Sequence, residues 1–257
     1  MTDAPDHMMF DARHLARGWL SVAIASGTVG AQPALWRTVA IESFPEGVRL
    51  VATDSYMLLT AWVPNIDHDL APEPELDEAP MAVAVAIDPN GRAKGLLSHL
   101  LHLASAKDAE LVEVKLALGI VVDADGPSST FEGMEARWVI IEQVDHERLK
   151  LPVYDGAYPT WRALHVHFEP EKTEAVGLST SIVGRLAKLG RWWPECPLVW
   201  HFGGELKAAA VSVHGAENAV TGLVMPVRWN LDHNRPQADV DAEEETPDPV
   251  DGIQGEQ

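Results

Sequence analysis

VRLVATDSYMLLTAWVP, residues 48–64, consists of two apolar runs separated by the polar sequence TDS at 53–55. Runs of this length, rich in β-branched and aromatic residues and bounded by turn residues, are typical of β-strands. The segment therefore predicts a strand, a corner and a second strand. The sequence PEG at 45–47 separates the first of these strands from another apolar run at 37–44, and this pattern predicts a hairpin that leads into the corner.

Further strands follow along the chain. Residues 112–118 alternate between apolar and other residues, which is the period of a strand with one buried face. Other apolar runs predict strands at 137–144, 198–202, 206–214 and 219–229.

Three segments have the periodicity of amphipathic helices: residues 12–26, 89–107 and 180–194. Asp11 is the expected N-cap of the first. The third groups four large apolar side chains on one face, which are Ile182, Leu186, Leu189 and Trp193. The order of one helix followed by strands occurs three times. It predicts an α+β protein with repeated helix-plus-antiparallel-meander units and the helices on one face.

The distribution of charge separates these helices from the rest of the chain. The 257 residues carry a formal net charge of −20, from 39 acidic residues against 19 Lys and Arg. Taken whole, this charge disfavours binding to nucleic acid. The three predicted helices, however, hold no Asp or Glu, where the chain average would give about seven, and they hold eight of the basic residues. Solvated helices usually mix both signs. We therefore favour a surface that meets a polyanion over an incidentally basic polar face.

The remaining composition indicates a cytoplasmic protein. Cys196 is the only cysteine, so no internal disulfide can form and a reducing compartment is expected. The first ten residues lack the pattern of a signal peptide, and no apolar run is long enough for a membrane span. Residues 67–80 are rich in Pro and acids and predict an exposed loop. Residues 231–257 contain nine acids and one Arg, and are expected to be disordered.

Three motifs resemble those of the bacterial DNA polymerase III beta sliding clamp family. VATDSYMLLTAWVP, residues 51–64, resembles the family's strand–corner–strand, where VATDG-x-RLA is typical. YDGAYPTWRAL, residues 154–164, resembles its DG-x-FPDYRRVLP segment, and VTGLVMPVRW, residues 220–229, resembles its C-terminal strand, which ends in an MPMR(L)-type sequence. The motifs occur in the family's order, and the resemblance covers about residues 8–229.

The resemblance implies a DNA clamp fold, a ring whose helices line a hole around double-stranded DNA while the sheets form the outer wall. Such a ring holds DNA topologically through phosphates rather than base edges. The residues implied to face DNA are Arg13, Arg17, Arg92, Lys94, His99, His102, Lys107, Arg185, Lys188 and Arg191.

The resemblance also implies a groove that captures short peptides of a DNA polymerase and the clamp loader. Its residues here would be Thr53, Ser55, Tyr56, Met57, Leu58, Leu164, Val224, Met225, Pro226, Val227 and Arg228. Apolar walls with a few polar edges suit such a peptide. Without the resemblance, the same strand residues would be interpreted as core. Ser55 and Met57 replace the glycine and arginine usual in the family, which puts the binding of host-type peptides in doubt.

The resemblance sets the expected domains and subunit number. Residues 8–165 would form one clamp domain of two units, 166–229 a partial domain of one unit, and 230–257 the tail. Family members carry six units per subunit and about twelve close the ring, so three units per chain imply a homo-tetramer, or a trimer if a fourth, degenerate unit is present. The small size is closer to a phage or mobile-element clamp than to a host one. No cofactor, metal or membrane partner is expected.

Other groups of residues give only weak indications of a metal or nucleotide site. The spacing of His165 and His167 fits one strand face, and His99 and His102 are three apart on a helix, but no third metal ligand is evident near either pair. Residues 123–126 resemble only the start of a calcium loop, and a turn is the better interpretation. No phosphate loop or dinucleotide fingerprint is present.

Two other functions are also compatible with the sequence. A clamp-like regulator or decoy would bind replication proteins without closing a ring, and would be a monomer in solution. An enzyme would need a cleft of convergent ionisable groups with perturbed pKa values, which the sequence does not suggest. The favoured function is a sliding clamp, a processivity factor without enzymatic activity.

Overall fold

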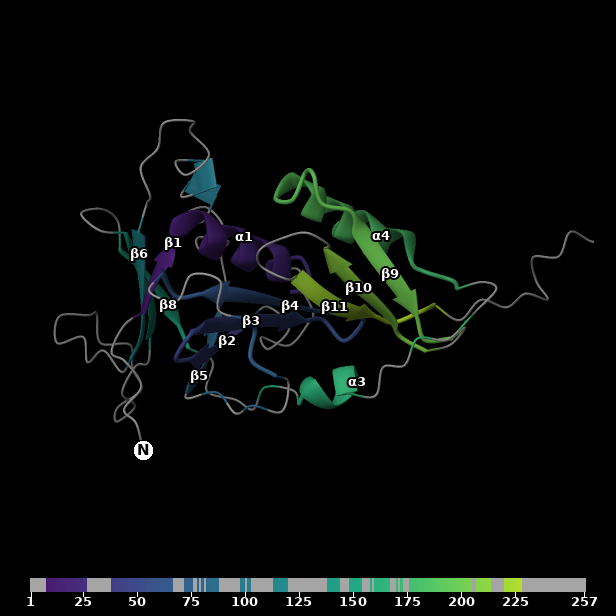
Figure 1. Cartoon of the computed structure of the whole chain (residues 1–257), viewed down its shortest axis with the longest axis horizontal. Coiled ribbons are helices and arrows are strands. Elements are labelled where there is room, and N and C mark those ends of the chain that lie inside the picture. The colour runs from purple at the N-terminus through teal and green to yellow at the C-terminus, as the bar shows by residue number, and fades with distance from the viewer. Residues whose placement is uncertain are drawn as a thin grey trace, which may run out of the picture. The chain divides into compact units, whose positions relative to one another are not determined.

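Two antiparallel sheets form the framework of the protein (Figure 1). The four-stranded sheet has the order β1 (Met8–Asp11), β6 (Glu113–Gly119), β7 (Trp138–Gln143) and β8 (Arg148–Pro152). The seven-stranded sheet has the order β5 (Ala82–Ile87), β2 (Thr38–Phe44), β3 (Gly47–Thr53), β4 (Met57–Pro64), β11 (Val220–Val224), β10 (Ala209–Val213) and β9 (Leu198–Phe202).

The computed structural model describes most of the segment from Met8 to Val227. The described residues are 8–26, 38–66, 72–75, 78, 80, 82–87, 98–99, 101–102, 113–119, 138–143, 148–153, 158, 160–166, 170, 172, 176–204, 207–213 and 220–227. The expected tail and residues 123–126 lie outside them.

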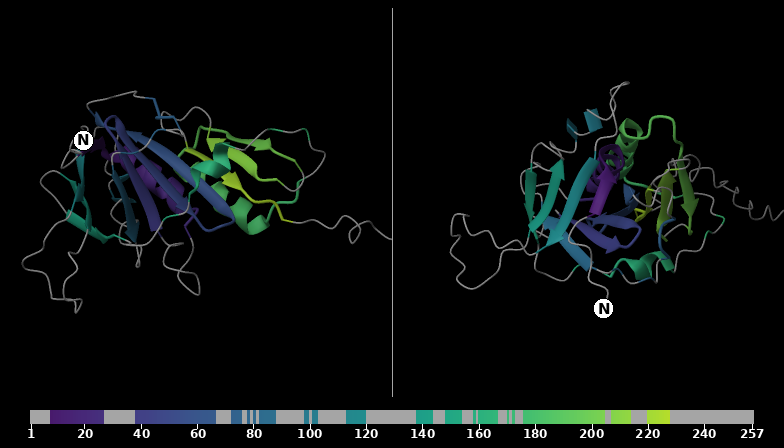
Figure 2. Two further views of the ribbon diagram at one scale, coloured as in Figure 1. Left: turned by 90° about the horizontal axis from the view of Figure 1, so that it is seen from below. Right: turned by 60° about the vertical axis from the view of Figure 1, so that its left-hand side comes forward.

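The helices lie on both sides of the seven-stranded sheet. On one side are α1 (Ala12–Ala23) and α4 (Thr180–Leu186), which continues as the 3-10 helix η3 (Ala187–Arg191). The short helix α3 (Arg162–Val166) lies on the other side (Figures 1 and 2). Within the described residues, no helix combines the length and the apolar character that crossing a membrane requires.

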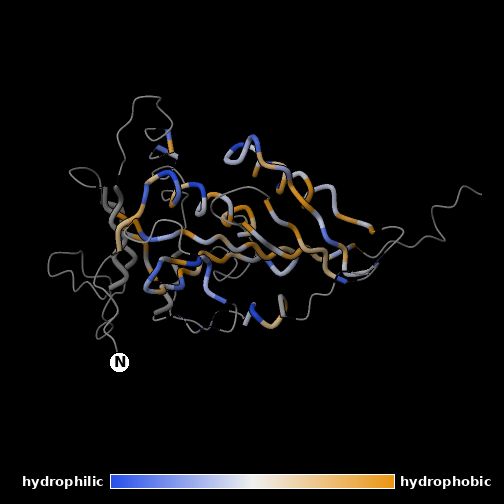
Figure 3. The backbone as a smooth tube through the Cα atoms, in the orientation of Figure 1, coloured by the Kyte–Doolittle hydropathy of each residue, from blue (hydrophilic) through white to orange (hydrophobic). Residues whose placement is uncertain are grey.

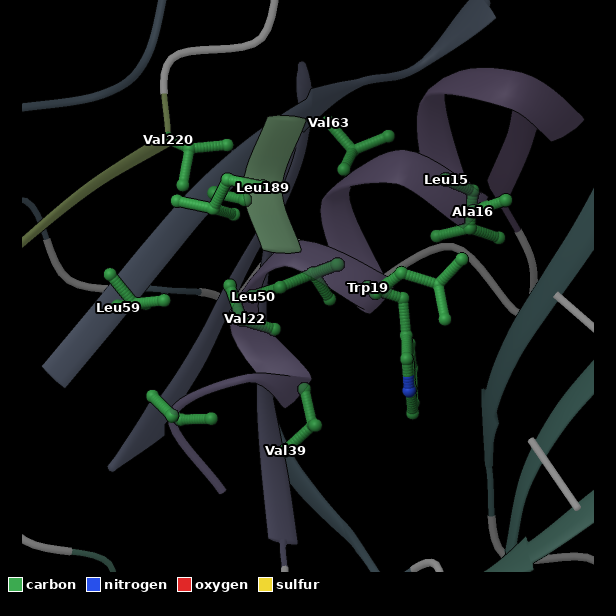
Figure 4. Packing of buried hydrophobic residues seen from close by; sticks show 14 of the residues in the cluster. Leu15, Ala16, Trp19, Val22, Val39, Leu50, Leu59, Val63, Leu189 and Val220 are labelled. Carbon is green, nitrogen blue, oxygen red and sulfur yellow. The ribbon is translucent and has the colours of Figure 1, made fainter. Parts of the chain in front are cut away.

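The main core lies between α1, α4 and the sheets. Trp19 of α1 is almost fully buried in a cluster that includes Leu50 of β3 and Leu59 of β4 (Figure 4). Leu189 of η3 joins the same cluster, so both helices share one apolar core. Apolar residues, orange in Figure 3, recur along the central strands, whose two faces are both covered. Burying one such side chain contributes about 1.5–3 kcal/mol.

The pairing of β4 with β11 joins the last part of the chain to the first. Thr60 and Thr221 face each other, with their Oγ1 atoms 2.8 Å apart. Gly222 lies opposite Leu59, where a Cβ atom would come within 2.2 Å of the Leu58 carbonyl oxygen. Only glycine fits so close to the neighbouring backbone. Gly222 in the sequence VTGLV therefore allows β11 to pair with β4.

Most of the expected elements are present with shifted ends. The hairpin pairs Phe44 with Gly47, and the strand–corner–strand is confirmed. Asp11 caps α1 by accepting a hydrogen bond from the His14 backbone N–H at 2.9 Å. The third helix is confirmed with all four of its apolar positions buried, although its last turns are 3-10 rather than α. Of the expected helix 89–107, only 98–99 and 101–102 are described, and they are helical.

Three strands and one helix were not predicted. β1 is only four residues long, and the strands β5 and β8 lie in stretches to which no element was assigned. The strand expected to carry His165 is wrong, because residues Arg162–Val166 form α3. His165 therefore lies in a helix, and His167 lies outside the described residues. The boundary between residues 165 and 166 stays a prediction.

Candidate functional site

The corner between β3 and β4 is built around the carboxylate of Asp54. Its Oδ1 accepts hydrogen bonds from the backbone N–H groups of Tyr56 and Met57, at 3.0 and 2.9 Å. The backbone N–H of Asp54 donates to the carbonyl of Met57 at 3.2 Å. A short side chain that accepts from the residues just after it is what Asp supplies in turns. Asp54 is buried, so its charge needs these donors.

Ser55 holds the corner in the left-handed backbone region, with φ of 72°. Left-handed backbone favours glycine, because a Cβ atom meets the following carbonyl. Ser55 is exposed, and its backbone N–H donates to Thr53 Oγ1 at 3.3 Å. The corner therefore keeps its shape with serine, at some cost in stability.

Arg185 of α4 fixes this corner to the end of α1. Its Nη1 donates to Asp54 Oδ2 at 2.5 Å, and its Nε donates to the carbonyl oxygen of Ile24 at 3.1 Å. A cation at the C-terminal end of a helix is stabilised by the carbonyl groups there. The side chains of Arg185 and Asp54 are 28 % and 4 % exposed. Arg185 is thus half-buried and paired with the corner and the end of α1, and its expected role in facing DNA stays a prediction.

The residues after β11 run beside the corner, held by two backbone hydrogen bonds. The backbone N–H of Met225 donates to the carbonyl of Tyr56 at 2.8 Å, and that of Val227 donates to the carbonyl of Gly177 at 2.8 Å. The side chains of Tyr56, Met225 and Val227 are 61 %, 48 % and 47 % exposed. Three large apolar side chains therefore remain accessible around an ordered backbone, which is the composition expected of a partner surface.

A second apolar cluster lies on the face of the sheet opposite α1. Leu58 of β4 and Leu223 of β11 pack there with Trp161, and Tyr158 lies at the edge of the cluster. The Tyr158 hydroxyl donates to the carbonyl of Val51 at 3.1 Å. Burial, and to a lesser extent the charge of Glu42, raises the pKa of the Tyr158 phenol above its usual value. The phenol therefore stays neutral and serves as a donor.

A buried ion network holds α3 against this face. Glu42 Oε1 accepts from Trp161 Nε1 at 3.0 Å, and Glu42 Oε2 pairs with Arg162. Arg49, fully buried on β3, lies directly opposite Glu42 on β2 and donates from Nε to Glu73 Oε1 at 2.7 Å. The guanidinium carbon of Arg49 also lies 5.7 Å from the ring centre of Trp161. This network was not predicted from the sequence, although the hairpin turn fixes the register that pairs Glu42 with Arg49.

The structure brings most of the expected groove residues together. Val224 pairs with Met57 in the sheet, and the backbone N–H of Met225 donates to the carbonyl of Tyr56. The motifs at residues 51–64 and 220–229 are therefore adjacent. Leu164 is 61 % exposed on α3. Thr53 and Pro226 are half-buried and Ser55 is exposed, whereas Met57, Leu58 and Val224 are buried in the two apolar clusters. Arg228 lies outside the described residues.

The expected DNA-facing residues divide into three groups. Lys188 and Arg191 are exposed, as are His99 and His102, while Arg13 and Arg17 are half-buried on α1. The Arg17 guanidinium lies 5.3 Å from the ring centre of Trp193, which joins α1 to the end of η3. Leu101, between the two histidines, packs against the core that α1 and α4 share. Arg92, Lys94 and Lys107 lie outside the described residues.

Metal binding finds no support in the described part of the chain. No group of three or more His, Cys, Asp or Glu residues comes close enough there to hold an ion.

The chain is similar in fold to solved bacterial DNA polymerase III beta subunits. The chain is similar to a DnaN sliding clamp, DNA polymerase III subunit beta, from Pseudomonas aeruginosa bound to griselimycin, with a TM-score of 0.53, 13 % identity and coverage of 89 % of this chain and 68 % of that one. It is also similar to a putative DNA polymerase III beta subunit from Eubacterium rectale, with a TM-score of 0.56, 8 % identity and coverage of 89 % and 67 %. A DNA polymerase sliding clamp from Bacillus subtilis gives a TM-score of 0.53, 12 % identity and coverage of 90 % and 66 %.

The chain thus spans about two thirds of the length of these proteins. Its sequence matches no protein-family model and no curated protein. These likenesses show that the chain has the α+β fold of the bacterial DNA polymerase III beta sliding clamps.

Proposed function

We propose that the chain is a DNA sliding clamp, a processivity factor that closes a homo-oligomeric ring around duplex DNA and tethers a DNA polymerase. The observation that carries this proposal is the shared position of α1 and α4. Both helices lack acidic residues in a chain of net charge −20, and both lie on one side of the seven-stranded sheet (Figure 1). A basic inner face on an acidic protein attracts a polyanion only at that face.

The DNA contacts would be electrostatic and independent of base sequence. Lys188 and Arg191, both in η3, are exposed and would supply these contacts. Their contacts would be to phosphates, so affinity falls as salt rises. Retention would come from the closed ring rather than from these weak contacts.

The surface around the corner would capture a short apolar peptide of the polymerase or of a clamp loader. Tyr56, Met225 and Val227 supply exposed apolar contacts, and Met225 can adapt its shape to different side chains. Leu164 would form the opposite wall. In this role the protein acts by binding and has no catalytic site of its own. The compartment would be the bacterial cytoplasm, with a phage or mobile element as the proposed source.

Topological retention on DNA tests this function directly. The protein is loaded onto a duplex fixed at one end and carrying biotin at the other, and streptavidin is then added to block the free end. A closed ring stays on the blocked duplex through a high-salt wash and leaves when a restriction enzyme cuts it.

The controls use matched charge changes. Lys188→Glu with Arg191→Glu should reduce loading, whereas Lys172→Glu, an exposed lysine outside the helices, should not. Loss of the wild-type protein in the salt wash from blocked DNA, as from open DNA, would contradict a ring. It would instead favour a monomeric regulator or decoy that binds replication proteins.

A further inference from the structure

The short helix α3 depends on tertiary contacts for its position. It has five residues, and isolated helices of this length are unstable in water. Trp161, immediately before the helix, is almost fully buried, whereas Leu164 within it is 61 % exposed. The exposed wall of the proposed partner surface is therefore held in place by buried residues.

Apolar packing holds α3 against the sheet without fixing its orientation. Trp161 packs with Leu58 of β4 and Leu223 of β11, the two strands that lead to the corner and to Met225. The hydrophobic effect is non-directional, so this packing alone would allow α3 to turn or slide over the sheet. A directional contact is needed to give Leu164 a single position.

Glu42 supplies that contact from within the sheet. Its Oε1 accepts a hydrogen bond from Trp161 Nε1 at 3.0 Å, and its Oε2 accepts one from Arg162 Nη2 at 2.5 Å. The two oxygens therefore engage consecutive residues at the start of α3. Glu42 belongs to β2, which is paired with β5 on one side and with β3 on the other, so its backbone is fixed.

Arg49 fixes the carboxylate of Glu42 in turn. The two residues lie opposite each other in β2 and β3, with Arg49 Nη1 3.6 Å from Glu42 Oε2. Glu42 is 3 % exposed and Arg49 is fully buried. A buried carboxylate needs charged and hydrogen-bonding partners, and hydrogen bonds that involve an ionised group are the strong ones. The sheet and Arg49, rather than solvent, therefore set the orientation of this carboxylate.

We propose that Glu42 is a positioning residue for partner capture: through Trp161 and Arg162 it fixes the place of Leu164, and so raises the affinity for the partner peptide without touching it. The inference rests on the proposed function and deepens the role of the same partner surface. The physical reason is preorganisation, because a wall that is already in place loses less freedom when the peptide binds. Without the contact, the peptide itself would have to order α3, and it would bind more weakly.

The probe is a peptide selected from a phage-displayed random library on the immobilised full chain. Selection keeps only peptides that fail to bind the double variant Tyr56→Ser with Met225→Ser, so that the peptide used binds the partner surface. Fluorescence anisotropy of the labelled peptide then measures Kd for each variant. A library that yields no such peptide would overturn the proposed partner surface, and this inference with it.

Trp161→Phe removes the hydrogen bond to Glu42 and keeps an aromatic ring in the apolar cluster. Its Kd is expected to rise about 3- to 10-fold, and that of Leu164→Ala at least as much. The double variant should have the Kd of Leu164→Ala alone, since the hydrogen bond acts through Leu164 and the two effects are not additive. The matched control is Trp200→Phe, at a half-buried tryptophan of β9, which should keep the wild-type Kd.

Arg162→Met gives a second route if Trp161→Phe misfolds, because the Arg162 side chain is 30 % exposed. It removes the other hydrogen bond to Glu42 and should raise Kd only while Leu164 is present. An equal rise in Kd with and without the Leu164 side chain would reveal a general structural effect and overturn the positioning role. An unchanged Kd in folded Trp161→Phe and Arg162→Met would overturn it too. Neither result affects the proposed function, which stands if the wild type binds the selected peptide and stays on blocked duplex.

Discussion

Replacing Arg185 by methionine should loosen the corner that carries the proposed partner surface. The change keeps the aliphatic length of the side chain and removes its donors to Asp54 and to the carbonyl of Ile24. Removing one partner of a buried ion pair costs about 3–5 kcal/mol. Arg185 is 28 % exposed, so solvent screens part of the interaction. Asp54 also keeps its two backbone donors from Tyr56 and Met57. We therefore expect a loss of about 2–3 kcal/mol in the free energy of unfolding.

Urea denaturation at one fixed protein concentration measures this loss, since oligomerisation makes apparent stability depend on concentration. Asp54→Asn and the double variant complete a mutant cycle, in which a coupling free energy of about 1 kcal/mol or more is expected for residues in direct contact. Arg191→Met is the matched control, because Arg191 is exposed, and it should change stability by less than about 0.5 kcal/mol. Hydrogen exchange should rise at residues 54–57 in Arg185→Met. A stability equal to that of Arg191→Met, with unchanged exchange at the corner, would show that Arg185 does not hold the corner in place.

Three other substitutions test the fold around the site. Gly222→Ala should destabilise the protein by at least about 2 kcal/mol in urea denaturation, because its Cβ would lie 2.2 Å from a carbonyl oxygen. Gly184→Ala, where the Cβ meets nothing within 4 Å, should instead stabilise by up to about 1 kcal/mol; equal effects would contradict the β4–β11 geometry. Ser55→Gly should raise the free energy of unfolding by about 0.5–1 kcal/mol, since glycine adopts positive φ without strain, while Ser55→Ala should give no gain. Glu42→Gln should destabilise by about 3 kcal/mol, with a change in tryptophan fluorescence, because it removes a charge beside the fully buried Arg49; a neutral effect would show that Glu73 alone satisfies this arginine.

Part of the candidate site could be predicted from local sequence. The corner follows from two apolar runs interrupted by a turn-forming Asp, and the structure has that corner at Asp54. The ion network could also have been found. A hairpin that pairs Phe44 with Gly47 necessarily places Glu42 opposite Arg49, and two opposite charges facing each other within apolar strands indicate a buried pair.

Other features depend on contacts that no local pattern reports. Periodicity placed Arg185 on the polar side of its helix, but its partners, Asp54 and Ile24, are more than 130 residues away in the chain. The two histidines of 165–167 have a spacing that suits a strand, yet Arg162–Val166 is helical and is anchored at its start by Trp161 and Glu42. A short segment takes the conformation that its tertiary contacts stabilise, and this overrides weak local preferences.

Local sequence was enough to predict the hairpin, the capped first helix and the apolar face of the third helix, because each depends on residues within a few positions of one another. The segregation of charge onto the helices is likewise a property of the sequence. Contacts between distant segments, by contrast, pair β11 with β4, bring Arg185 to Asp54 and leave β9 at the edge of its sheet. Strand order and long-range ion pairs depend on the free energy of the whole chain, so no single segment is enough to predict them.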